Sequence, residues 1–286
     1  MTPISARSDP RSAFVLPERD AAALRFIGKG YEVAQYQLHE AVFPGRSPTV
    51  VSRFVRRWER KGLLISERLH GFGMNRLRLT RSGKETLLLR GGEREAELFV
   101  PRKPVALKDL AHTLWINDAR VVLGSFFPRA TILPAWALGR IQPRPPVVPD
   151  VLALVRTKRL RPGLALAVEI DLGGEPLTRV FLPKLKALRA FLSGIPETRS
   201  AVVVLTSGSG RRANLVAALQ DGNDATPTAV EVLPQCGGRE GLMALGNLFR
   251  PFVDANPQPE DGNPGRCNNF AVSEGMGFAL AREAGG

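Results

Sequence analysis

Residues 45–64, GRSPTVVSRFVRRWERKGLL, have the pattern of one helix with both of its ends marked. Ser47 is placed to cap the N-terminus, Pro48 suits the first helical position, and Gly62 suits the stop. Four apolar residues recur at the i, i+3, i+4 and i+7 spacing that buries one face of a helix: Val51, Phe54, Val55 and Trp58. The pattern predicts an amphipathic helix.

The opposite face of this helix carries polar and basic side chains suited to contact a nucleic acid. They are Thr49, Ser52, Arg53, Arg56, Arg57 and Arg60. The chain as a whole has 286 residues, with 40 Lys and Arg against 27 Asp and Glu, a formal net charge of +13. Such a balance favours a polyanionic partner. A basic helix face that is only solvated is the alternative.

The segments on either side of the helix predict the rest of a small module. Upstream, EVAQYQLHEAVF (32–43) predicts a second short helix, and PGRS joins the two helices as a tight turn. Downstream, LLISERLHGFGMNRLRLTRSG (63–83) alternates apolar and polar residues around a Gly-containing turn, which predicts a β-hairpin. Helix, turn, helix and basic hairpin follow one another in a winged helix, whose second helix binds in the major groove of duplex DNA.

The predicted hairpin has two faces. We expect Leu77 and Leu79 to point inward and Arg76 and Arg78 to point outward, because side chains alternate along a strand. The two arginines would then contact the DNA backbone beside the helix. Double-stranded DNA is therefore the expected partner of this module.

Composition and pattern divide the chain into five parts. They are a tail over 1–16, a winged helix-turn-helix over 17–91, a charged linker over 92–105, an α/β domain over 106–253 and a Pro/Gly-rich tail over 254–286. Strand and helix patterns alternate in the fourth part, which is typical of a mixed or parallel sheet. The predicted fold class is α/β, or α+β for the whole chain.

The strand pattern LALAVEIDLGG, residues 164–174, places two carboxylates on one face of the sheet. Glu169 and Asp171 would lie about 6 to 7 Å apart and repel by roughly 2 to 3 kcal/mol at an effective dielectric near 20. Asp150 precedes another strand pattern, which should pair with this one as a hairpin. A divalent cation would relieve the repulsion, as would a basic side chain of the next helix, from Arg179, Lys184 or Lys186.

Asp150 and Glu169 on adjacent strands resemble the PD-(D/E)xK nuclease core, in which paired acids hold a divalent cation that activates water. The resemblance implies Mg²⁺ on Asp150 and Glu169, and catalytic roles for these two residues, Asp171 and Lys184. The lysine of that pattern stands two residues after the second acid, where this chain has Asp171. Lys184 on the following helix is therefore the candidate. A non-catalytic, nuclease-like scaffold is the alternative reading.

Over roughly residues 20–210 the chain resembles the replication-relaxation proteins of plasmids and integrative elements. The resemblance rests on YQLHEAVFPGRSPTVVSRFVRRWERKGLL, NRLRLTRSGKETL, LAHTLWINDARVVL, VPDVLALV and AVEIDLGGEPLTRVFLPKLKALRAFL, in this order. A threonine cap before the second helix is missing, and Leu188 stands where an aromatic residue is common. The resemblance implies DNA binding near a replication or transfer origin, with a relaxase or replication proteins as partners.

Other features narrow the setting. No run of 18 apolar residues is present, so we expect no membrane span. Cys236 and Cys267 lack the spacing of a zinc site or a disulfide framework, which favours a cytoplasmic protein with reduced thiols. Three functions stay open: a DNA-binding protein of a mobile element, a Mg²⁺-dependent endonuclease, and a transcriptional regulator whose α/β domain senses a ligand or forms a homodimer.

Overall fold

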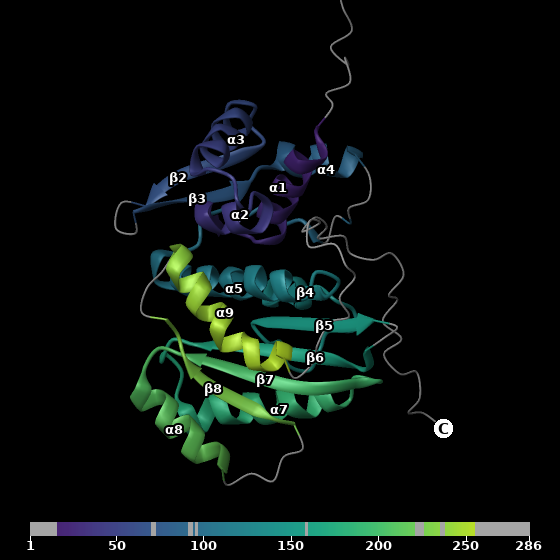
Figure 1. The fold of residues 1–286 in the computed structure, drawn as a ribbon, viewed down its shortest axis with the longest axis vertical. Coiled ribbons are helices and arrows are strands. Elements are labelled where there is room, and N and C mark those ends of the chain that lie inside the picture. Colours follow the sequence, from purple (N-terminus) through teal and green to yellow (C-terminus); the bar gives the residue numbers. More distant parts are fainter. Residues whose placement is uncertain are drawn as a thin grey trace, which may run out of the picture.

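The computed structural model of the chain contains helices and two separate sheets (Figure 1), which confirms the mixed α/β fold class. The structure describes residues 16–69, 73–90, 94, 97–157, 160–220, 226–234 and 238–254. The predicted tails over 1–16 and 254–286 lie, apart from one residue each, outside these described residues. None of the described helices combines the length and hydropathy that crossing a membrane requires.

The N-terminal module consists of four helices and a small antiparallel sheet. Its elements are α1 (Glu18–Lys29), β1 (Val33–Ala34), α2 (Gln35–Val42), α3 (Pro48–Arg60), β2 (Leu64–Leu69), β3 (Met74–Leu79) and α4 (Arg81–Arg90). The sheet order is β1-β3-β2, and β2 pairs with β3 in the predicted hairpin. The sequence pattern also predicted the second helix, over 32–43, but the helix begins only at Gln35, because Val33 and Ala34 instead form β1 against β3.

Helix α3 confirms the prediction made from residues 45–64. Its four apolar stripe residues are all at most 3% exposed. Ser47 occupies the N-cap position, but its side chain forms no capping hydrogen bond. Gly62 ends the helix with a φ of 70°, a left-handed conformation that glycine adopts at little cost. Beyond it, the Leu63 N–H donates to the Trp58 carbonyl over 2.9 Å and closes the last turn.

The second part of the chain is built around a five-stranded mixed sheet. Its elements are α5 (Leu107–Phe126), β4 (Thr131–Pro134), α6 (Ala135–Leu138), β5 (Val151–Thr157), β6 (Leu160–Asp171), η3 (Leu177–Phe181), α7 (Leu182–Ser193), β7 (Thr198–Thr206), α8 (Ser209–Gln220), β8 (Thr228–Val232) and α9 (Gly238–Asp254). The order is β4-β5-β6-β7-β8. The first three strands pair antiparallel, including the predicted β5–β6 hairpin, whereas β6, β7 and β8 are parallel.

Helices cover both faces of this sheet. Helices α5 and α9 lie on one face, between the sheet and the N-terminal module, and α7 and α8 lie on the other (Figure 1). The sequence pattern did not predict α9, because its sequence contains the poor helix formers Gly238, Gly246 and Pro251. Apolar burial against α5 accounts for a helix that local propensity alone does not indicate.

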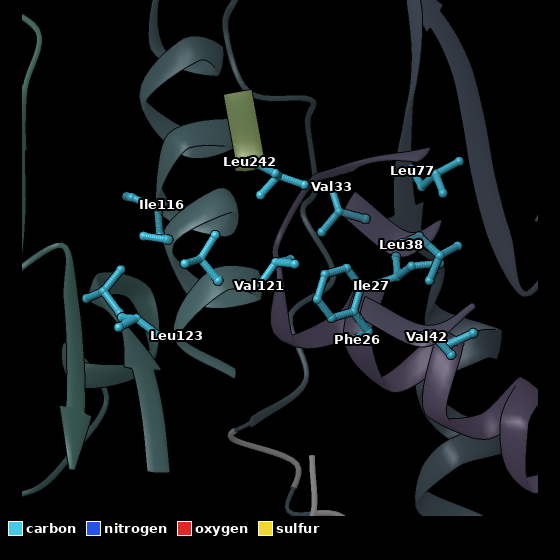
Figure 2. Packing of buried hydrophobic residues seen from close by; sticks show 14 of the residues in the cluster. Phe26, Ile27, Val33, Leu38, Val42, Leu77, Ile116, Val121, Leu123 and Leu242 are labelled. Carbon is cyan, nitrogen blue, oxygen red and sulfur yellow. The ribbon is translucent and has the colours of Figure 1, made fainter. Parts of the chain in front are cut away.

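The two parts share one hydrophobic core. Figure 2 shows Phe26, Val33 and Leu38 of the N-terminal module on one side and Ile116 and Val121 of α5 on the other. Polar contacts tie the same seam together. The Asn117 side-chain amide donates to the carbonyls of Gly30 and Glu32 over 3.0 and 2.8 Å, and the Trp136 indole donates to the Lys29 carbonyl over 3.0 Å. The N-terminal module is therefore packed directly against α5.

Candidate functional site

The first candidate site is the basic face of α3. Thr49, Arg53, Arg56 and Arg60 are exposed at the spacing i, i+4, i+7 and i+11, so they form one line along the helix, opposite the buried stripe. Within the described part of the chain, no carboxylate forms an ion pair with any of the three arginines. The one hydrogen bond among their side chains runs from Arg60 Nε to the Arg56 carbonyl over 3.2 Å. Three positive charges thus remain available to an external partner.

Two other predicted contact residues of α3 already have internal partners. The Ser52 hydroxyl accepts a hydrogen bond from the Gln35 side-chain amide over 3.0 Å and donates to the Pro48 carbonyl. Arg57 forms an ion pair with Asp20, a buried residue of α1, while its guanidinium also lies 4.9 Å from the Trp58 ring centroid. These bonds position α3 on its neighbours, and they leave Ser52 and Arg57 less available than the line of exposed residues.

The prediction that Arg76 and Arg78 point outward is wrong. Arg76 is 5% exposed, and its guanidinium donates to the Glu67 carboxylate over 2.8 and 3.1 Å and to Glu32 over 3.4 Å. Arg78 lies 3.6 Å from both of these carboxylates. The outer face of the hairpin sheet is covered by the Val105 segment and α5, so alternation along β3 places the arginines in an interface.

In this interface Arg76 and Arg78 have a structural role. The buried Glu32 carboxylate also accepts the Val105 N–H over 2.9 Å. Burial raises the pKa of Glu32, while the two arginines and the Val105 hydrogen bond oppose that rise. Arg76 and Arg78 therefore neutralise a buried acid between the module and α5, and they are not placed to contact a DNA backbone.

The second candidate site lies at the end of the large sheet where β6 and β7 finish and β5 begins. Asp150 directly precedes β5, and the pairing of Val151 with Val168 brings it beside Glu169. Glu169 is 1% exposed, and its Oε2 accepts a 2.5 Å hydrogen bond from Lys184 Nζ of α7. Asp150 Oδ2 accepts the Ile170 N–H over 2.8 Å. The structure thus brings together three of the four residues predicted as catalytic.

The fourth predicted residue, Asp171, shares the face of Glu169 but has partners of its own. Arg211 Nε donates to Asp171 Oδ2 over 2.7 Å, and the Gly173 N–H donates to Oδ1 over 2.9 Å. Each carboxylate on this face therefore has a separate cation, Lys184 for Glu169 and Arg211 for Asp171. Arg179 and Lys186, the other cations considered from the sequence, are exposed.

The electrostatics of the cluster follow from its burial. Burial raises the pKa of Glu169 to about 8, the charge of Asp150 adds to the rise, and Lys184 opposes it. The pKa of Lys184 is raised despite its burial, because Glu169 and Asp150 stabilise the ammonium ion. His112 of α5 lies with Nε2 3.2 Å from Asp150 Oδ2, and that hydrogen bond raises the pKa of the imidazole.

The fit of a divalent cation to this cluster is partial. Mg²⁺ accepts one or two carboxylates and completes its shell with water or phosphate oxygens. Among the described residues, Glu169 Oε1 is buried without a hydrogen-bond partner, so this oxygen is available as a metal ligand. Against this, Lys184 is bonded to the other oxygen. No group of three or more His, Cys, Asp or Glu side chains in the described ranges is arranged to hold a metal ion.

Two residues of the cluster were not predicted from the sequence. His112 reaches Asp150 only because α5 packs across the sheet, and the sequence carries no local signal for that contact. Arg211 lies in the first turn of α8, directly after the short loop of Ser207 and Gly208 that follows β7. A signal existed, because the carboxyl ends of adjacent parallel strands meet at one edge, and this places the loop beside Asp171.

The chain thus combines a helix–hairpin module that exposes a basic helix with a mixed α/β domain that carries a charged cluster at its sheet end. The sequence profile of the replication-relaxation family matches residues 24–204, more than half of the chain. The chain belongs to the replication-relaxation family, which indicates a role in the replication or relaxation of a mobile element. None of the curated proteins and none of the solved structures matches the chain.

Proposed function

We propose that the chain is a DNA-binding protein of a mobile genetic element and that its N-terminal module is a winged helix bound to duplex DNA. The observation that carries this proposal is the line of Arg53, Arg56 and Arg60 on α3, exposed and free of acidic partners among the described residues. An unpaired row of arginines opposite a fully buried stripe matches the periodic charge of a DNA backbone.

In this arrangement α3 is the helix that enters the major groove. Thr49, near its N-terminus, is placed for base edges, because the first residues of such a helix reach deepest into the groove. The three exposed arginines farther along contact phosphates on the groove wall. Arg57, Arg76 and Arg78 stabilise the module instead, since each is already paired with a carboxylate.

The test is a binding assay on duplex DNA with the Arg53→Ala/Arg56→Ala double variant. Each phosphate contact contributes about 0.9 log units of affinity per tenfold decrease in salt, counted from about 1 M. Loss of two contacts should therefore weaken DNA binding about 30-fold at 0.15 M salt. The matched control is Arg81→Ala/Arg199→Ala, which removes two exposed charges elsewhere. Unchanged DNA binding by a folded double variant would refute the assignment of α3.

For the second domain we propose a nuclease-like scaffold that contacts DNA or a protein of the replication or relaxation machinery. Support comes from the ion pair of Lys184 with Glu169 and that of Arg211 with Asp171. Lys184 and Arg211, together with the raised pKa of Glu169, relieve the repulsion between two acids on one strand face. The domain then needs no metal ion to be stable.

A Mg²⁺-dependent endonuclease is the second candidate, and the free Oε1 of Glu169 is the observation that favours it. The two roles differ in a melting experiment with Mg²⁺ or Mn²⁺. A scaffold should melt at the same temperature with and without metal. An endonuclease should be stabilised by metal, lose that response in Glu169→Gln, and nick plasmid DNA in a reaction that Asp150→Asn abolishes.

A further inference from the structure

A large cavity lies apart from both candidate sites, at the junction of the N-terminal module with the second domain. Its volume is about 1080 Å³, at the upper end of the range typical of small-molecule sites. Residues of α1, α2, α5, β4, α6 and α9 form its wall. Much of that wall is apolar, with Val122, Phe127 and Ile132 on one side and Leu242 and Met243 of α9 on another.

One charged group in this wall has no charged partner among the residues that the structure describes. Arg120 of α5 is 2% exposed, and the groups that it contacts are neutral: Nη1 donates to the Asn117 amide oxygen over 2.5 Å, and the guanidinium lies 5.6 Å from the Phe26 ring centroid. Its Nε is buried without a hydrogen-bond partner. Burial lowers the pKa of Arg120 to about 10, with no acid to offset that effect. An isolated buried charge is strongly unfavourable.

The acids around the cavity do not neutralise Arg120. Seven basic and three acidic residues belong to the wall. Each of the acids is already paired with another cation: Glu18 with Arg25 over 3.3 Å, Glu97 with Lys29 over 3.0 Å and Glu40 with Arg239 over 3.2 Å. The lining therefore has an excess of positive charge, and Arg120 is the most deeply buried of its cations.

We infer that this cavity binds a small organic anion with an apolar body, such as a medium-chain carboxylate, and that Arg120 holds the anionic group. The apolar wall accommodates the body of the ligand, while the carboxylate satisfies the free Nε and neutralises the guanidinium. A charge-assisted hydrogen bond to a buried guanidinium is among the stronger polar contacts in proteins. This inference is independent of DNA binding and of metal binding.

The probe for the test is octanoate, with octanol and acetate as controls for the apolar body alone and the charge alone. The full-length chain should bind octanoate saturably in isothermal titration calorimetry and melt at a higher temperature in its presence. Octanol and acetate should each bind at least tenfold more weakly. Equal binding of octanol and octanoate, or no saturable binding of octanoate by the wild-type chain, would overturn the inference.

Variants then locate the site. Arg120→Met should bind octanoate at least tenfold more weakly, whereas Arg120→Lys retains the charge and should keep part of the affinity. Arg120→Met should melt no lower than the wild type, because it removes an uncompensated charge; a purely structural arginine would behave in the opposite way. Octanoate binding that is unchanged in Arg120→Met would overturn the inference.

A third variant narrows the cavity without changing the arginine. A Cβ added to Gly246 of α9 would meet only Phe126, at 3.9 Å, so the position accepts a side chain that projects into the cavity. Gly246→Leu should therefore fold and should bind octanoate more weakly than the wild type. This variant keeps the test decisive if Arg120→Met does not fold, because full octanoate affinity in Gly246→Leu would place the ligand elsewhere.

Discussion

The basic face of α3 and the charged cluster at the sheet end use the same kinds of cation in opposite ways. On α3, Arg53, Arg56 and Arg60 are exposed and have no acidic partner in the described part of the chain. At the sheet end, Lys184 and Arg211 are each bonded to a buried carboxylate. A basic residue in a sequence therefore predicts a polyanion contact only when the fold leaves its charge uncompensated.

The hairpin that follows α3 in the N-terminal module leads to the same conclusion. Arg76 and Arg78 alternate with buried leucines, as residues of a solvated wing would, yet both face Glu32 and Glu67. Charge and periodicity alone do not distinguish these two arginines from those of α3. The difference arises because α5 packs on the hairpin and excludes water from that face.

The largest expected effect tests the buried side of α3. Trp58 is 2% exposed and its ring packs 6.4 Å from that of Phe54. Trp58→Ala should lower the free energy of unfolding by about 3 to 5 kcal/mol, because it leaves a large void in the core. Chemical denaturation followed by circular dichroism measures the loss. A variant as stable as the wild type would show that this face of α3 is not the core face.

The next effect concerns Glu169, whose carboxyl is bonded to Lys184, and is measured as the pH dependence of stability. The folded-state pKa of Glu169, about 8, lies above its ordinary value of 4.5, so the folded state binds this proton more tightly than the unfolded state. The stability that this group contributes is complete below about pH 4.5 and is lost as the pH rises through 8. Between pH 5.5 and 8 the loss amounts to about 3 kcal/mol.

Glu169→Gln should remove that pH dependence. The groups acting on Glu169 are Asp150, Lys184 and Glu175, and all three remain in the variant. Denaturation at pH 5.5 and pH 8 should therefore show a smaller loss of stability in Glu169→Gln than in the wild type, by about 3 kcal/mol. Equal losses in both proteins would mean that Glu169 is ionised across this range and that Lys184 fully compensates its burial.

The salt dependence of DNA binding tests how many cations α3 presents. Three phosphate contacts give a slope of about −2.7, so raising the salt from 50 to 200 mM should weaken binding about 40-fold, or about 2 kcal/mol. Five contacts, with Arg76 and Arg78 included, would give about 500-fold. When Arg53, Arg56 and Arg60 are all replaced by Ala, the slope of log affinity against log salt should become shallower by about 2.7. A similar loss on replacing Arg76 and Arg78 would instead favour a solvated wing.

The sequence predicted those parts of the molecule that local patterns determine. The ends and buried stripe of α3, the β2–β3 hairpin and the β5–β6 pairing all follow from spacing and from turn residues. The proximity of Asp150, Glu169 and Lys184 was predicted too, because a hairpin and the helix after it fix these positions. Each of these features depends on residues that are close in the chain.

The features that the sequence did not predict depend on contacts between distant segments. Helix α9 is stabilised by packing on α5, and His112 meets Asp150 across 38 residues of chain. The burial of Arg76 depends on Glu32 and Val105, which lie far from it in sequence. The hydrophobic periodicity of a single segment does not indicate such contacts, because each depends on how distant segments of the chain pack against one another.

The smallest expected effect compares two neighbouring arginines of the same helix. Arg57 is paired with Asp20, which is 1% exposed and whose Oδ1 has no hydrogen-bond partner, whereas Arg53 has no acidic partner in the described part of the chain. Arg57→Ala should destabilise the chain by about 1 to 2 kcal/mol, because it leaves the buried carboxylate of Asp20 with only the more distant Arg19, at 3.9 Å, among the cations that the structure places near it. The loss stays modest because Asp20 lies in the first turn of α1, where the helix dipole favours a negative charge.

Arg53→Ala is the matched control, and it should change stability by less than about 0.5 kcal/mol, as surface substitutions usually do. In a DNA-binding assay the order should reverse, with Arg53→Ala weakening binding more than Arg57→Ala. Measured together, the two variants separate an arginine that stabilises the module from one that contacts DNA. If Arg57→Ala weakened DNA binding as much as Arg53→Ala and left stability unchanged, its ion pair with Asp20 would not persist in solution, and the distinction between paired and available arginines on α3 would fail.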